Sequence, residues 1–362
     1  MKRPDAKTPR KCQIGTSEVH PKMVHVYRDD DADLSVLDGR KVAIIGYGNQ
    51  GRAQGLNMRD SGVEVLVGNI EDASFDRAEA DGFPTMSIAK AIQAGDVLCL
   101  FLPDEVQQEV YRQDIAPLLR SGQTLNFAHG YNIRYGFIRP PKDVDVIMVA
   151  PRMIGVGVRE RFEAGSGAPA FVAVEQDATG LAWPTTLAIA KAIGATRIGA
   201  LKTTFAEETE LDHFSEQAVW PVIVRLLTMA YELLTNRGYQ PEAVLLELYA
   251  SGEAAQVFQE MAEVGLFRQM SFHSQTSQYG TLSRASRVLP DDFRMIMAQI
   301  LDEIQQGTFA QEWEAERQAG YPRFRRLKAE ALSHRINDVE NSLWEIMQGS
   351  YRHSEKALSE HL

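Results

Sequence analysis

The sequence is short of cysteine, of positive charge and of long apolar stretches, and each shortage excludes a class of protein. Two cysteines in 362 residues cannot form a disulfide framework, which indicates a reducing compartment. Cys12 lies in a polar leader, whereas Cys99 lies in the apolar run 97–102, where we expect a small core residue. Lysine and arginine number 38 against 49 acidic residues, a formal charge of −11. Without a basic tract, this charge argues against nucleic acid as a partner.

Targeting signals are also missing. The chain has no signal-peptide core, and no uninterrupted apolar run approaches the roughly 18 residues of a membrane span. We therefore expect a cytoplasmic protein that neither enters nor crosses a membrane. A length of 362 residues favours two domains, and a hydrophobic share of 44% is enough for a full core.

A glycine-rich turn follows a polar arm that we place at residues 1–37. The apolar strand Lys41–Ile45 precedes it, and a helical stretch reaching Ser61 and a second strand at Glu64–Val67 follow. This strand–turn–helix context is what a dinucleotide-binding fingerprint requires. The three glycines allow the tight turn, the approach of a pyrophosphate and close helix packing, and the helix N-terminus supplies N–H groups. The cofactor-binding candidates here are Gly46, Tyr47, Gly48, Asn49, Gln50 and Gly51.

The loop after the second strand indicates which cofactor binds. It contains Asn69, Glu71 and Asp72, and its nearest basic residue, Arg77, lies beyond the turn. Acidic residues suit the free ribose hydroxyls of NAD and repel the 2′-phosphate of NADP. We therefore predict NAD.

Further strands end in residues suited to a ligand crevice. Apolar segments at 96–102, 124–128, 145–150 and 171–174 alternate with helical stretches, which predicts a parallel sheet whose carboxyl ends face the ligand. The strand ends contribute Leu102, Pro103 and Asp104, then His129, then Arg152.

The segment Thr203–Val219 begins a helical half. It lacks glycine and proline, and Asp212 and Glu216 are spaced to lie on one helix face. Two such carboxylates suit Mg²⁺, with substrate oxygens completing its shell; a solvated acidic face is the alternative. Further helices are predicted at about 204–236, 241–263, 291–305, 308–318 and 336–348, with Trp220, Met229 and Trp344 as core residues. The expected layout is α/β followed by all-α, with a Rossmann-type domain at 1–203 and a helical domain at 204–362.

Several motifs together resemble the ketol-acid reductoisomerase family. They are the glycine turn, Leu102–Val106, Phe127–Gly130, Val149–Pro151, Gln176–Gly180, Thr203–Val219 and the segment Ser274–Gly280. The similarity covers residues 20–350 in the family's order, and the length fits the short class.

The resemblance implies two Mg²⁺ ions in a knotted helical domain, with the site completed across a homodimer formed through these domains. Asp212 matches the carboxylate that bridges both metals, and Glu216 a ligand of one. His129 matches a residue at the cofactor end of the cleft, and Ser274 the serine that holds the substrate carboxylate. The family reaction is an alkyl shift in a 2-hydroxy-keto acid followed by hydride reduction.

Four departures from the family pattern concern cofactor, metal or substrate. Besides the acidic loop, Arg152 stands in place of a lysine and cannot exchange a proton as lysine can. The second metal pair, Glu247 and Glu253, is two residues too widely spaced; either a break at Gly252 restores its geometry or one ligand is lost. Trp220-Pro221 replaces small residues and would fill and bend the pocket wall. We assign catalytic roles to His129, Arg152, Glu253 and Ser274.

Three functions remain open. The first is an NAD- and Mg²⁺-dependent relative acting on a small polar acid, similar to the cyclopropanol-forming homologues of natural-product pathways, which use sulfonium-bearing dihydroxy acids. The second is an ordinary acetohydroxyacid isomeroreductase of branched-chain amino acid synthesis with a switched cofactor. The third is an inactive NAD-binding scaffold.

Overall fold

A computed structural model describes residues 24–347, which form two compact units. Most of the first unit precedes Phe205, and the second unit contains Phe205 onward. Two short segments from the first half, Pro103–Glu109 and Gly130–Arg139, belong to the second unit. The leader with Cys12 lies outside the described residues.

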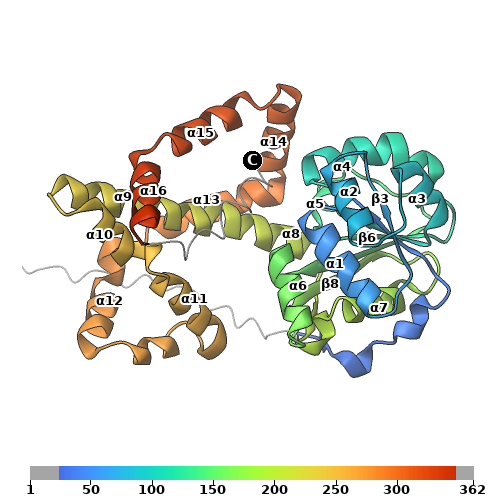
Figure 1. Ribbon diagram of the computed structural model, residues 1–362, viewed down its shortest axis with the longest axis horizontal. Coiled ribbons are helices and arrows are strands. Elements are labelled where there is room, and N and C mark those ends of the chain that lie inside the picture. The colour runs from blue at the N-terminus through green and yellow to red at the C-terminus, as the bar shows by residue number, and fades with distance from the viewer. Residues whose placement is uncertain (1–23, 348–362) are drawn as a thin grey trace, which may run out of the picture. The chain divides into compact units, whose positions relative to one another are not determined.

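The first unit is built on a sheet (Figure 1) of nine strands, which follow the order β1-β9-β8-β7-β6-β5-β2-β3-β4. All neighbours pair in parallel except β1 with β9 and β7 with β8. The strands are β1 (Val26–Tyr27), β2 (Val42–Ile45), β3 (Val65–Gly68), β4 (Thr85–Met86), β5 (Val97–Leu100), β6 (Thr124–Phe127), β7 (Asp145–Pro151), β8 (Ala170–Gln176) and β9 (Ala200–Lys202). The predicted α/β class is confirmed.

Helices cover both faces of this sheet because the central strands are apolar on both sides. Ile44 lies against α1, whereas Ala43 lies against the C-terminal end of α3. Cys99 belongs to the core as predicted, and burial raises the pKa of its thiol to about 12. The helices of this unit are α1 (Asn49–Asp60), α2 (Ala73–Ala80), α3 (Ile88–Ala94), α6 (Gly155–Glu163) and α7 (Ala182–Ala192), with a π-helical turn η3 (Tyr111–Ile115).

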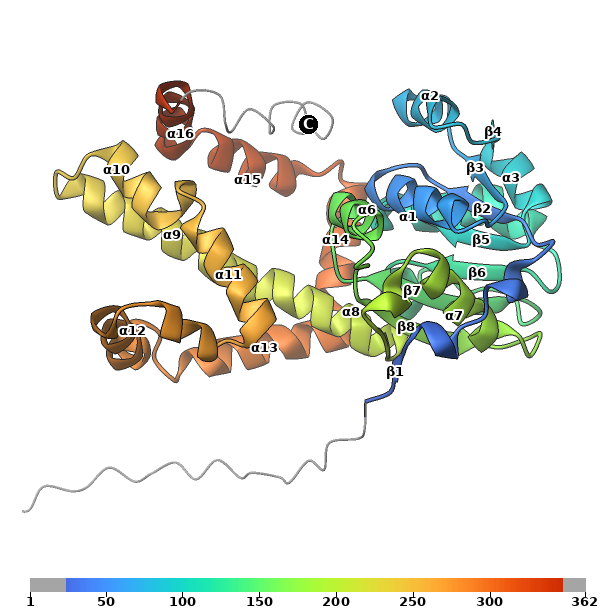
Figure 2. The ribbon, with the colours of Figure 1, turned by 60° about the horizontal axis from the view of Figure 1, so that its bottom comes forward.

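The second unit is helical throughout its described part, and one continuous helix runs from Phe205 to Asn236 (Figure 2). It consists of α8 (Phe205–Phe214), the π-helical turn η6 (Ser215–Val219) and α9 (Trp220–Asn236). Pro221 accounts for the π turn, because proline has no N–H to donate to the carbonyl of Gln217 four residues earlier.

The second unit contains further helices, and two of them, at residues 241–245 and 335–346, enclose a small core with the C-terminal part of the long helix. Tyr231, Val244, Leu245, Val339 and Leu343 are buried together there. These helices are α4 (Asp104–Val110), α5 (Tyr131–Arg134), α10 (Pro241–Leu245), the π turn η7 (Leu246–Ala250), α11 (Glu253–Val264), η8 (Arg268–Phe272), α12 (Gln275–Val288), α13 (Phe293–Gln306), α14 (Thr308–Gln318), α15 (Pro322–Leu332) and α16 (Arg335–Ile346).

The apolar face of the long helix is uncovered within one chain, and this corrects one expectation. Trp220 is 52% exposed, Met229 51% and Trp344 36%, so none of them is a core residue of the single chain. By length and composition alone, the helix could also cross a membrane, although its sequence contains no uninterrupted apolar run of that length.

Candidate functional site

The glycine turn has the close approaches that a dinucleotide site needs. Gly46 adopts a φ of +94°, and a Cβ on Gly51 would lie 2.0 Å from the carbonyl oxygen of Gly46. Strand β2 and helix α1 therefore meet at a distance that only glycine permits. A Cβ on Gly48, the N-cap of α1, would meet no atom within 4 Å, so there is open space in front of the helix N-terminus for a phosphate.

Buried polar contacts fix the backbone of this turn. The Tyr47 N–H donates to Oδ1 of Asn69 at 3.3 Å, and the buried Tyr47 hydroxyl donates to Asp81 at 2.9 Å. Arg52 pairs with the same carboxylate at 2.7 Å, and this hydrogen bond holds the pKa of Asp81 below its usual value. Burial raises the pKa of Tyr47, so its hydroxyl stays a donor.

The two acidic residues of the next loop have different environments. Asp72 is the N-cap of α2, and its Oδ1 accepts the N–H groups of Ser74 and Phe75 and the amide of Asn69. Glu71 is exposed and, with Asn69, lines a cavity of about 610 Å³. Of the two acids, Glu71 is therefore the one whose carboxylate faces the cavity without holding the loop, because Asp72 caps α2.

The turn after β7 is locked to the glycine turn. The side-chain amide of Gln50 donates to the carbonyl of Met153 at 3.0 Å, and a Cβ on Gly155 would lie 2.2 Å from the carbonyl oxygen of Asn49. Arg152 is half-buried with its guanidinium 5.1 Å from the centre of the Phe171 ring. Arg152 thus lies on a turn whose backbone packs directly against the glycine turn.

A buried carboxylate that sequence reasoning missed holds the peptide after His129. His129 lies two residues after the end of β6 and is half-buried. The next N–H, of Gly130, donates to Oε2 of Glu208 at 2.8 Å, and Glu208 is 1% exposed. Its spacing of four residues before Asp212 was the available signal, since it places Glu208 on the face of Asp212 and Glu216.

The predicted metal pair lies where α8 passes into the π turn. Asp212 is half-buried near the end of α8, and Glu216 is exposed within η6. Single π turns in α-helices occur often at functional sites. Arg134 fixes this part of α8 by its ion pair with Glu210 at 2.8 Å.

The second predicted pair is divided between two helical segments. Glu247 lies in the π turn η7, and Glu253 is the first residue of α11. Gly252 between them has a φ of +84°, so the expected break is present. Across residues 24–347, no three His, Cys, Asp or Glu side chains are close enough together to hold a metal ion, so one chain does not gather the four carboxylates.

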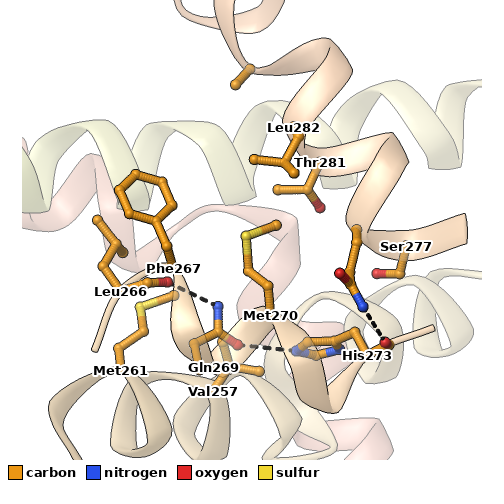
Figure 3. A pocket seen from close by; sticks show the side chains of 12 residues that line it. Val257, Met261, Leu266, Phe267, Gln269, Met270, His273, Ser277, Thr281 and Leu282 are labelled. Atoms are coloured by element: carbon orange, nitrogen blue, oxygen red, sulfur yellow. Dashed lines mark hydrogen bonds between the residues drawn. The ribbon is translucent and has the colours of Figure 1, made fainter. Parts of the chain in front are cut away.

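Two neighbouring pockets lie near Ser274 and Glu253; Glu253 lines one of them and Ser274 lines neither. Ser274 caps α12 and accepts the N–H of Ser277 at 3.2 Å. The adjacent His273 lines a pocket of about 360 Å³, in which its ring contacts the side chain of Gln269 at 3.2 Å (Figure 3). A neighbouring pocket of about 350 Å³ is lined by Glu253, Gln269 and His273. His273, which lines both pockets near these candidates, comes directly before Ser274 in the chain.

Comparison with known proteins identifies the family. Residues 36–199 match the NADPH-binding domain of acetohydroxy acid isomeroreductase, and residues 205–349 match the C-terminal domain of ketol-acid reductoisomerase. The chain belongs to the ketol-acid reductoisomerase family.

Similar ketol-acid reductoisomerases differ in the cofactor that their names state. The chain is 44% identical to "Ketol-acid reductoisomerase (NADP(+))" of Renibacterium salmoninarum over 89% of this chain and 94% of the relative. The enzyme of the same name from Methanocaldococcus jannaschii is 43% identical over 89% and 97%. An NADH-preferring ketol-acid reductoisomerase from an uncultured archaeon aligns with a TM-score of 0.85 at 35% identity, over 88% and 98% of the chains. The chain is therefore an oxidoreductase of this family with a nicotinamide cofactor.

The residues present fit the nicotinamide dinucleotide and the divalent cation that this reductoisomerase family implies. The Gly46–Gly51 turn leaves space for a dinucleotide phosphate at the start of α1. Asp212 and Glu216 supply only oxygen donors, which suit a hard divalent cation. A cation bound by Asp212 and Glu216 would need further ligands from the substrate or the protein, and a dinucleotide would need further contacts beyond the glycine turn.

Proposed function

We propose that the protein is an NAD- and Mg²⁺-dependent reductoisomerase that has been adapted to a small polar acid of a natural-product pathway. The single observation that carries the adaptation is Arg152, which stands on the turn locked to the cofactor loop where the family pattern has lysine. The exposed Trp220 and the Gly252 break support it, because they also change segments that carry predicted metal or substrate ligands.

The preference for NAD rests on Glu71. This side chain lines the cavity at the end of β3, where the adenosine ribose of a dinucleotide lies in this fold. A carboxylate accepts hydrogen bonds from ribose hydroxyls and repels a phosphate. The name of the NADH-preferring relative agrees with this proposal, and the names of the NADP(+) relatives oppose it.

We expect NAD(H) to bind at least tenfold more tightly than NADP(H), a difference of about 1.4 kcal/mol or more. Fluorescence titration of both cofactors measures it. Glu71→Gln should narrow the difference, whereas Glu79→Gln, at an exposed α2 position that does not line the cavity, should not. Equal dissociation constants for the two cofactors in the unaltered protein would refute the preference.

The metal site is proposed to be completed by a second copy of the chain. Asp212 and Glu216 form one carboxylate pair, while Glu247 and Glu253 are not gathered with them in a single chain. The uncovered apolar face of the helix Phe205–Asn236, of which 11% of the most apolar window is buried, offers the surface for a homodimer through the helical units. We place this dimer in the cytoplasm; sedimentation without detergent tests its solubility and its size.

The chain's own residues then have separate tasks. When bound, the nicotinamide accepts and returns a hydride, and Mg²⁺ stabilises negative charge on substrate oxygens. Ser274 holds the substrate carboxylate, and Arg152 neutralises an oxyanion but is a poor proton shuttle. His129 and Glu253 remain as proton-transfer groups. The buried Glu208 positions the peptide after His129 through the Gly130 N–H.

The proposed reaction begins with a dihydroxy acid that carries a leaving group. Oxidation of one carbinol to a ketone acidifies the neighbouring carbon, and loss of its proton gives an enediolate. That carbon displaces the leaving group, which departs with its bonding electron pair, and a three-membered ring closes. Return of the hydride, with a proton, gives a cyclopropanol, so the substrate has lost one proton and the leaving group in total. A sulfonium group is such a leaving group.

We expect acetolactate to be converted poorly, whereas a dihydroxy acid with a leaving group exchanges hydride with the cofactor. Arg152 slows the proton exchange that the family reaction requires, and Trp220 adds bulk to the pocket wall; its ring can attract a cationic group by about 0.5–2 kcal/mol. Steady-state kinetics with both substrates at saturating NAD(H) and Mg²⁺ decide this. Turnover of acetolactate at about 1 s⁻¹ or faster would instead support the ordinary isomeroreductase.

That second candidate is favoured by the relatives of 43–44% identity, whose names are those of ketol-acid reductoisomerases. A third candidate, an inactive NAD-binding scaffold, predicts that no Mg²⁺ binds. Isothermal titration of Mg²⁺ in the presence of NAD separates it from both enzymes.

A further inference from the structure

The cavity beside Glu71 is lined by an acidic and a basic side chain that make no polar contacts within the described part of the chain. Lys90 on α3 and Asp114 on η3 line it together with Asn69 and Glu71. Both side chains are exposed, and in the described part of the chain neither takes part in a salt bridge or a side-chain hydrogen bond. Two opposite charges that share a cavity without pairing are available to a ligand.

The rest of the cavity suits a flat ring. Its apolar walls are Ile70, Phe75, Met86 and Ile88. In this fold, the ribose of a dinucleotide lies at the end of β3 beside Asn69 and Glu71. A base attached to that ribose therefore enters the space that Lys90 and Asp114 also line.

We propose that Asp114 and Lys90 recognise the polar edge of adenine. Adenine presents an amine donor at position 6 beside the ring acceptor N7. Asp114 accepts a hydrogen bond from the amine, and Lys90 donates to N7. A 6-oxopurine presents an acceptor in place of the amine, which faces the Asp114 carboxylate unfavourably. Asp114 is thus a specificity-determining residue on an element separate from the loop that contains Glu71.

The inference rests on dinucleotide binding by the first unit but not on the preference for NAD over NADP, because both contain adenine. The test compares dissociation constants for NADH and for reduced nicotinamide hypoxanthine dinucleotide, whose base carries an oxygen at position 6. The unaltered protein should bind NADH at least about tenfold more tightly, the discrimination expected of one well-placed contact to a base edge.

Asp114→Asn should remove or invert this preference, because its amide can donate to the oxygen. Lys90→Met should weaken both ligands by a similar factor, since both bases contain N7. Asp143→Asn, at an exposed position that does not line the cavity, is the matched control and should change neither.

The inference is wrong if the Asp114→Asn variant keeps the ratio of the two dissociation constants that the unaltered protein shows. Equal affinity of the unaltered protein for the two dinucleotides overturns it as well and leaves the proposed reaction untouched. Failure of both to bind overturns the dinucleotide site and this inference together.

Discussion

Asp212→Asn is expected to lower turnover by at least about a hundredfold while the dissociation constant for NAD stays nearly unchanged. Asp212 is half-buried at the end of α8, and the proposed site gives it the largest share in holding the cations. An amide keeps the shape of the side chain but removes the charge. The glycine turn and Glu71, which are proposed to bind the cofactor, belong to the first unit, so NAD affinity should survive.

Asp302→Asn on α13 is the control for this variant, because it makes the same chemical change at an exposed position of the same unit. Rates are measured at saturating NAD(H) and Mg²⁺, and NAD affinity by fluorescence. Retention of more than about a tenth of the activity would show that Asp212 is not the main metal ligand.

Gly51→Ala is expected to weaken NAD binding by more than tenfold, about 1.4 kcal/mol, and to lower the thermal midpoint. The added Cβ would lie 2.0 Å from the carbonyl oxygen of Gly46 and 3.3 Å from the Ile44 side chain. That oxygen belongs to the backbone, so the turn itself must move away from its binding geometry.

Gly55→Ala provides a matched comparison one helical turn further along α1. Its added Cβ would meet its neighbours at 3.5–3.8 Å, ordinary contact distances. This substitution should preserve NAD binding and raise stability by up to about 1 kcal/mol through helix propensity. Similar behaviour of the two variants in titration and thermal unfolding would mean that the close approach at Gly51 does not shape the cofactor site.

Local patterns predicted the centre of the first unit and the long helix, because their signals lie within a few residues. The strand before Gly46 and the helix after it form a continuous pattern that needs no distant partner. Strands β1, β4 and β9 have two or three residues each, too few for a periodic pattern. Helices α12 and α15 were missed, although α15 begins at Pro322, a favourable first-turn position for proline.

The parts of the site that sequence could not predict depend on distant partners. Glu208 accepts a hydrogen bond from an N–H 78 residues away, so its spacing from Asp212 could place it on the same helix face but could not reveal this partner. Asp72 was grouped with Glu71, but its capping of α2 appears only once the loop is folded. Trp220 was assigned to the core by its type, whereas its cover is absent from the single chain.

The uncovered face of the helix Phe205–Asn236 bears on how the stability of the folded chain would depend on its concentration. If a second chain buries this face, association stabilises only folded chains, and the unfolding equilibrium then follows mass action. Dilution would shift the equilibrium toward separated chains with Trp220 and Met229 in water. The thermal midpoint would therefore rise with protein concentration, and the cellular supply of the chain would itself set how much of it stays folded.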